Sequence, residues 1–212
     1  MHPRAILLDL DGTLADSLPV LRLAYRDFLR QFQLSPTDAE FDSINGPPLA
    51  EVVRRLKAAH GLPGGEEELL AGYRSAIDRV YACVAPRFGA RELLQKARVN
   101  KCSIGIVTSN SAERARAWVE EVTLANLIDF IVSADDVRYG KPNPEPYMLA
   151  ARRASCALST IVAVEDSPLG ARSAVAAGLK TYVLTGEPNE TNRWPRDVQR
   201  IETLRVLSEQ LW

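Results

Sequence analysis

Residues 5–13, AILLDLDGT, decide how the rest of the chain is interpreted. Four apolar residues run without interruption from Ala5 to Leu8, a pattern typical of a strand buried on both faces of a sheet. Asp9 and Asp11 follow at once, and alternation along an extended chain would point both carboxylates to the same side. Because two like charges repel each other unless a cation lies near them, we expect this strand to lead into a functional site.

The bulk composition is typical of a soluble globular protein. The chain has 212 residues, 46% of them hydrophobic and 25% charged, which suits one large domain or a core with a modest insert. A formal net charge of −1 gives no support for a nucleic-acid or membrane partner. No apolar run is long enough to span a bilayer, and the three cysteines are scattered without a CxxC pair. We expect a cytoplasmic protein without a disulfide framework or a zinc site.

Further short apolar runs predict an α/β fold with a parallel sheet. Four runs follow the first one: IGIV (104–107), IDFIV (128–132), IVAV (161–164) and TYVL (181–184). Between them lie segments with helical spacing: 112–121, 144–154 and 169–177. Alternating strands and helices indicate a Rossmann-like, doubly wound parallel sheet with helices on both faces. Gly178 is placed to end the last of these helices.

The roughly 95 residues between the first two runs read as helices. Apolar residues recur at three- and four-residue steps in three segments, and the breaks contain Pro and Gly: 18–32, 49–56 and 69–81. We predict three or four amphipathic helices that form a cap domain, residues 16–82, inserted in a core domain made of 1–15 and 83–212. The polar tail, 186–200, is followed by a last predicted helix at 201–211.

Polar residues follow the predicted strands where a parallel sheet places its ligands, beyond the carboxyl ends of the strands. They are Asp9, Asp11, Gly12 and Thr13; Thr108, Ser109 and Asn110; Lys141; and Glu165 and Asp166. Carboxylates this close favour a hard cation such as Mg²⁺, and a lysine with a hydroxyl beside them could hold a phosphate. One carboxylate could attack phosphorus while a second transfers protons.

Four of these segments together resemble the haloacid dehalogenase superfamily. They are DLDGT (9–13), VTSN (107–110), GKPNPEPY (140–147) and VEDSPLGA (164–171), in the order and spacing of that family's motifs. The likeness covers essentially the whole chain. The helical insert after the first motif resembles the C1-type cap of the phosphoglycolate phosphatase and β-phosphoglucomutase branch. The family's strand order would place the first, second and fourth runs side by side.

The resemblance implies a role for each residue at the strand ends. Asp9 would be the nucleophile and Asp11 the general acid and base. Other implied roles are phosphate binding by Thr108, Ser109, Asn110 and Lys141; Mg²⁺ binding by Asp9, the carbonyl of Asp11 and Asp166; and support of these groups by Gly12, Thr13 and Glu165. The implied activity is a Mg²⁺-dependent phosphatase that hydrolyses a small phosphate ester through an aspartyl-phosphate intermediate.

A phosphosugar mutase of the β-phosphoglucomutase type is the alternative. Those relatives place a histidine early in the first cap helix, near the position of Leu21, and no histidine lies between His2 and His60 here. A hydrolase is therefore favoured. Dehalogenase relatives lack the second aspartate, which is present as Asp11. A non-enzymatic binding protein that kept the fold would be expected to lose Asp9 or Asp11. We expect a monomer or a weak homodimer.

Several polar segments have two interpretations. Arg22 and Arg26 could face the substrate or form a solvated helix face. The turn at 45–48, NGPP, could face the active site and contact the leaving group, or simply join two helices. Asp135 and Asp136 could belong to a solvated loop or could orient Lys141.

Overall fold

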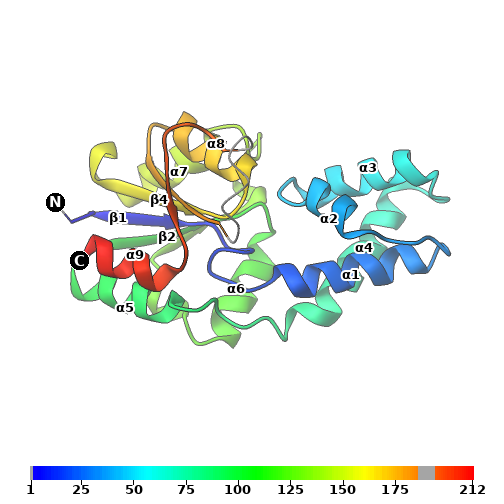
Figure 1. The fold of residues 1–212 in the computed structure, drawn as a ribbon, viewed down its shortest axis with the longest axis horizontal. Helices are drawn as coiled ribbons and strands as arrows, with labels where there is room; N and C mark the ends of the chain where they lie inside the picture. The colour runs from blue at the N-terminus through cyan, green and yellow to red at the C-terminus, as the bar shows by residue number, and fades with distance from the viewer. Residues whose placement is uncertain (1, 186–193) are drawn as a thin grey trace.

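A parallel sheet forms the centre of the computed structural model, which describes residues 2–185 and 194–212 (Figure 1). Within those residues the sheet has six strands in the order β3-β2-β1-β4-β5-β6. The strands are β1 (Ala5–Leu8), β2 (Ser103–Val107), β3 (Phe130–Val132), β4 (Ile161–Glu165), β5 (Lys180–Leu184) and β6 (Val198–Ile201). The strands β1, β2 and β4 are neighbours, which confirms the expected order.

The first strand occupies the middle of the sheet. Leu8, its last residue, pairs with Ile106 of β2 and with Val164 of β4. The ladder continues for one more residue, because the Asp9 amide donates to the Val164 carbonyl at 3.0 Å. The register therefore brings the segments that follow β1, β2 and β4 to the same edge of the sheet.

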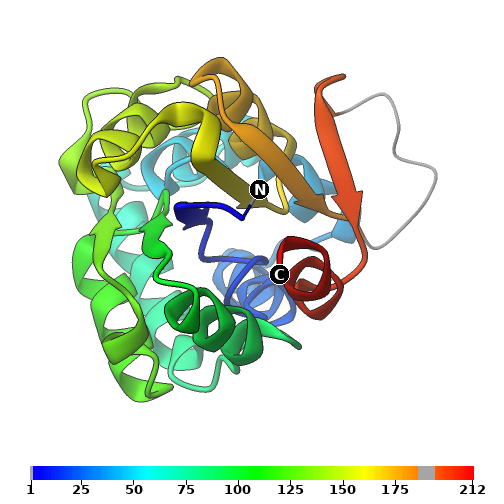
Figure 2. The same cartoon turned by 90° about the vertical axis from the view of Figure 1, so that its left-hand side faces the viewer.

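Helices cover both faces of the sheet, as the doubly wound prediction requires (Figure 2). Ala5 and Leu7 face an apolar cluster with α7 and α8, whereas Ile6 and Leu8 face a second cluster with α5 and α9. The helices are α5 (Ala90–Val99), α6 (Ala112–Glu121), α7 (Glu145–Ala154), α8 (Pro168–Ala176) and α9 (Leu204–Leu211), with short 3₁₀ turns η1 (Ala125–Leu127), η2 (Ala134–Asp136) and η3 (Leu158–Thr160). Gly178, at φ +79°, follows α8 as expected.

A separate group of helices lies beside the edge of the sheet where β1 ends (Figure 1). We call these the cap helices: α1 (Leu18–Arg30), α2 (Asp38–Ile44), α3 (Leu49–His60) and α4 (Glu66–Tyr81). They pack mainly on one another, and the Phe28 ring of α1 stacks on the Tyr73 ring of α4 with 4.8 Å between centroids. A helical insert between β1 and β2 is thus confirmed, while the division into domains at residues 15 and 82 stays a prediction.

The structure corrects the predicted tail. Val198–Ile201 forms the edge strand β6, and α9 begins at Leu204 rather than at residue 201. Gln199 and Arg200 of β6 are exposed, and β6 pairs with β5 at the edge of the described sheet, so the strand lacks the continuous apolar run that marked the others. Residues 186–193 of the predicted polar tail lie outside the described residues. Among the described residues, no helix has the length and apolar character needed to cross a membrane.

Candidate active site

A crevice between the sheet edge and the cap helices collects most of the predicted site residues. The cavity has a volume of about 120 Å³. From the core it is lined by Asp9, Asp11, Thr108, Ser109, Asn110, Lys141 and Asp166. Of the other predicted residues, Thr13 and Glu165 contact this set from behind, and Gly12 lies in the turn that follows β1.

The chain turns sharply directly after β1. The amides of Leu14 and Ala15 both donate to the Leu10 carbonyl, and Gly12 has a φ of +84°. A Cβ atom on Gly12 would lie 1.9 Å from Oδ2 of Asp166, so only glycine allows this close approach.

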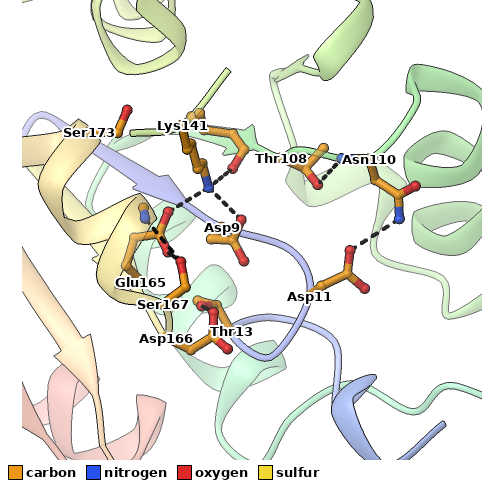
Figure 3. A network of polar contacts seen from close by, with 12 residues as sticks. Asp9, Asp11, Thr13, Thr108, Asn110, Lys141, Glu165, Asp166, Ser167 and Ser173 are labelled. Carbon is orange, nitrogen blue, oxygen red and sulfur yellow. Dashed lines mark hydrogen bonds and ion pairs between the residues drawn. The ribbon is translucent and has the colours of Figure 1, made fainter. Parts of the chain in front are cut away.

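The side chains of Asp9 and Asp11 line the same crevice, as strand alternation leads us to expect, although β1 itself ends at Leu8. The carboxylate of Asp9 contacts Lys141, whereas that of Asp11 faces Asn110 (Figure 3).

Lys141 is the buried cation of the site. Its Nζ donates to Oδ1 of Asp9 at 2.6 Å, to the Val107 carbonyl at 2.8 Å and to the carboxylate of Glu165. Burial by itself would lower the pKa of Lys141, but the adjacent carboxylates of Asp9 and Glu165 outweigh it and raise the pKa above its ordinary value. Lys141 therefore remains charged and stabilises Asp9 as a carboxylate.

Glu165 holds Lys141 in place. Its fully buried carboxylate accepts hydrogen bonds from Lys141, from the Tyr147 hydroxyl at 2.7 Å and from the Ser167 hydroxyl at 3.1 Å. The sequence predicts only a supporting role for Glu165 and carries no signal for Tyr147. In the described contacts, Asp135 and Asp136 do not orient Lys141. Asp135 accepts from the main-chain amide of Ala112, and Asp136 accepts from the Ser133 hydroxyl and forms an ion pair with Arg153.

The oxygen atoms near Asp9 suit a hard divalent cation. Asp9, Glu165 and Asp166 each place a carboxylate oxygen within 4.8 Å of the others. Burial, and then Glu165, raise the pKa of Asp166 to about 7, and burial raises the pKa of Asp9 despite Lys141, because three carboxylates share this small volume. Both oxygens of Glu165 accept from side-chain donors, whereas the described contacts engage one oxygen of Asp9 and one of Asp166, which leaves these two as the better ligands. This donor set fits Mg²⁺, which prefers oxygen.

Asp11 belongs to a second network, most of which the sequence does not predict. Its Oδ1 accepts from the Tyr81 hydroxyl at 2.6 Å, and its Oδ2 accepts from the Asn110 amide at 3.1 Å. Arg114 donates to Oδ1 of Asn110 at 2.6 Å and to Asp78 of α4. In the sequence, Tyr81 belongs to an apolar helical stripe and is interpreted as a core residue. The one sequence signal for this network is the i, i+4 spacing of Asn110 and Arg114, which allows their side chains to meet on a helix.

Thr108 and Ser109 follow β2 at the floor of the crevice. Thr108 is 4% exposed, and its hydroxyl oxygen accepts from the Asn110 amide nitrogen of the main chain at 3.0 Å. The hydroxyl proton of Thr108 is therefore available to a ligand. Ser109 lines the cavity beside it.

The cap side of the crevice is mostly apolar. It is lined by Leu21, Phe41, Ile44, Asn45, Gly46, Pro47, Leu49, Val52, Tyr73 and Ile77. The 45–48 turn faces the core, since a Cβ on Gly46 would lie 3.7 Å from the Cβ of Ser167. Arg22 and Arg26 instead form ion pairs with Asp38 on the cap surface, which favours the solvated interpretation.

The chain is similar to proteins of a known family over most of its length. The family model described as haloacid dehalogenase-like hydrolase matches residues 6–184. Hexitol phosphatase A of Escherichia coli (strain K12) is 32% identical over 199 residues, covering 91% of this chain and 88% of that protein. Validoxylamine A 7'-phosphate phosphatase of Streptomyces hygroscopicus subsp. limoneus is 30% identical over 184 residues, covering 86% and 85%.

A solved structure shares the fold over nearly the whole chain. CbbY from Rhodobacter sphaeroides, solved in complex with phosphate, superposes with a TM-score of 0.84 at 23% identity, covering 97% of this chain and 96% of that one.

Proposed function

This chain belongs to the haloacid dehalogenase-like hydrolase family, and from that membership we propose that it hydrolyses a small phosphate monoester through a phosphoaspartate formed on Asp9. It is a phosphatase that acts on phosphorylated small metabolites, as its relatives' names indicate. The observation that carries the proposal is the buried pair of Lys141 and Asp9, 2.6 Å apart at the floor of the cavity. This pair places the nucleophile beside a fixed positive charge that favours its ionised form.

The reaction has two steps, and Asp9 forms a bond to phosphorus only in the first. An oxygen of Asp9 attacks phosphorus while the ester P–O bond breaks, and Asp11 gives its proton to the departing alcohol oxygen. In the second step Asp11 takes a proton from water as the water oxygen bonds to phosphorus and the bond to Asp9 breaks. The products are the alcohol, inorganic phosphate and the original carboxylate of Asp9.

Asp9, Asp166 and the main-chain carbonyl of Asp11 would hold Mg²⁺. The bound ion would offset the charge of the carboxylates and withdraw charge from the phosphoryl oxygens. Lys141 and the hydroxyl of Thr108 would hold two of those oxygens, with Ser109 beside them. Asn110 is assigned to orientation of Asp11, because its side-chain amide already donates there.

The cap lining bears on the choice between hydrolase and mutase. Leu21 lines the crevice at the position where the mutase branch would carry a histidine. A leucine can neither donate nor accept a proton, which supports transfer of the phosphoryl group to water. The apolar side chains around Leu21 favour a compact alcohol that packs against them once water is displaced.

The test is a panel of phosphate monoesters, including hexitol and sugar phosphates, scored for released phosphate with Mg²⁺ and with a chelator. We expect turnover only with the metal, and Asp9→Asn should lower it at least about a thousandfold, because the nucleophile is lost. The exposed α1 residue Asp27 provides the control, since Asp27→Asn should leave turnover unchanged. Undiminished Asp9→Asn turnover would refute the mechanism, and sugar-phosphate isomerisation without free phosphate would establish the mutase.

A further inference from the structure

The side chain of Asp11 is held at both oxygens. The Tyr81 hydroxyl donates to Oδ1 at 2.6 Å, and the Asn110 amide donates to Oδ2 at 3.1 Å (Figure 3 shows the second contact). The two donors come from different parts of the molecule, since Tyr81 is the last residue of cap helix α4 and Asn110 follows β2. Both oxygens of Asp11 therefore accept hydrogen bonds in this arrangement.

We propose that Tyr81 is a positioning residue that fixes one oxygen of Asp11 and thereby aims the other at the leaving group. The proposal rests on the proposed function, in which Asp11 transfers the proton. The bond from Tyr81 is the shorter of the two, and hydrogen bonds from a hydroxyl to a carboxylate are strong. Oδ2 is therefore the oxygen that can leave its partner, Asn110, and turn to the substrate.

The Tyr81 hydroxyl acts as a hydrogen-bond donor and keeps its proton. Tyr81 is 5% exposed, and burial, followed by the charge of Asp11, raises its pKa well above the ordinary value. The hydroxyl therefore keeps its proton throughout the reaction. In each step the transferred proton moves between Oδ2 of Asp11 and either the alcohol or the water oxygen, and the hydrogen bond from Tyr81 to Oδ1 remains.

Arg114 ties this arrangement to the cap. Its guanidinium lies 5.7 Å from the centroid of the Tyr81 ring and donates to Asn110 and Asp78 at 2.6 Å each. Asp78 and Tyr81 are both on α4, one helical turn apart. A cation over the ring holds the phenol in orientation, and the same cation orients the amide of Asn110. The end of α4 is thus coupled to the direction of the Asp11 carboxylate.

The experiment compares two leaving groups in Tyr81→Phe. An alkyl phosphate needs a proton on its departing oxygen, whereas p-nitrophenyl phosphate releases a stable phenolate and needs little. We would measure the rate of alcohol or phenol release in the first turnover, which isolates the first step. We expect Tyr81→Phe to lower this rate by about 10- to 100-fold for the alkyl ester and by less than about threefold for the nitrophenyl ester, with KM nearly unchanged.

The ratio of the two rates decides the outcome. It does not depend on how much of the variant is folded, so partial loss of folded enzyme cannot imitate the effect. Equal losses for both esters, or no loss for either, would overturn the proposal. Tyr182→Phe is the matched control, because Tyr182 is a buried tyrosine of β5 away from the crevice and should leave the ratio unchanged.

Asp11→Asn separates this proposal from the proposed function. If Asp11→Asn shows the leaving-group dependence and Tyr81→Phe does not, the role of Tyr81 is refuted and the role of Asp11 stands. If Asp11→Asn lacks the dependence as well, Asp11 is not the proton donor and the proposed mechanism fails with it.

Discussion

Replacing Lys141 with methionine tests the central electrostatic argument about the site. Methionine matches the length of the side chain but removes the positive charge that contacts both Asp9 and Glu165. The side chains of these carboxylates are 10% and 0% exposed. Removing one partner of a buried ion pair costs about 3–5 kcal/mol, because the remaining charge is left without compensation. With two carboxylates affected, we expect Lys141→Met to lose about 4 kcal/mol of unfolding free energy at neutral pH.

The loss should depend on pH in a fixed direction. Burial already raises the pKa of Asp9 in the folded protein, and removal of Lys141 would raise it further. A carboxyl with a raised folded-state pKa destabilises the fold as pH rises above its unfolded value of about 3.9. In urea unfolding without divalent metal, the deficit of Lys141→Met should therefore be larger at pH 8 than at pH 5.

A second substitution turns this into a sharper test. Glu165→Gln removes one of the two carboxylates that Lys141 contacts, so the double variant should be more stable than Lys141→Met alone by about 1–2 kcal/mol. The exposed Lys101→Met should be nearly neutral at both pH values. A deficit below about 1 kcal/mol, or a double variant less stable than Lys141→Met, would refute the reasoning.

Two further substitutions test backbone and loop features. Gly12→Ala should lower turnover about a hundredfold, because the added Cβ would lie 1.9 Å from Oδ2 of Asp166 and would force that side chain to move. Gly178→Ala is the control, because Gly178 has a similar positive φ with open space around it, and this variant should keep its activity. Equal losses of turnover in the two variants would contradict the argument. At Asp136, burial would raise the pKa, but hydrogen bonds from Ser133 and the charge of Arg153 outweigh it and lower the pKa to about 2. Asp136→Asn should therefore lower the free energy of unfolding in urea by about 1 kcal/mol at pH 7, after allowance for solvent screening. This difference in stability from the parent should vanish as pH falls from about 4 through 2, and a pH-independent difference would count against the reasoning.

The sequence predicts most of the core of the fold and the residues that meet at its edge. Continuous apolar runs mark strands that are covered on both faces, and the motif residues follow those strands directly. In a parallel sheet this places Asp9, Thr108 and Asp166 together with no knowledge of side-chain geometry. The edge strand β6 escaped the prediction because its exposed Gln199 and Arg200 interrupt the apolar pattern.

Contacts between distant segments could not be predicted in this way. The apolar spacing of α4 identifies Tyr81 as a buried residue, which it is, but periodicity carries no information about the partner of its hydroxyl. Glu165 is similar, since nothing in VEDS shows that Lys141 and Tyr147 converge on its carboxylate. These pairs depend on how the cap helices and the loops meet the sheet edge, which is decided by tertiary packing.

The central position of β1 also determines the order in which this molecule is completed during synthesis. The first strand leaves the ribosome early, but Ala5 pairs with Ser103 and Ile161, which are made much later. The cap helices can meet one another within one contiguous stretch, from Leu18 to Tyr81, so local contacts can form while β1 still waits for its neighbours. Asp9 can meet Lys141 and Asp166 only after residues 141 and 166 have been made. We expect a nascent chain released before these residues are made to carry the nucleophile without the groups that activate it.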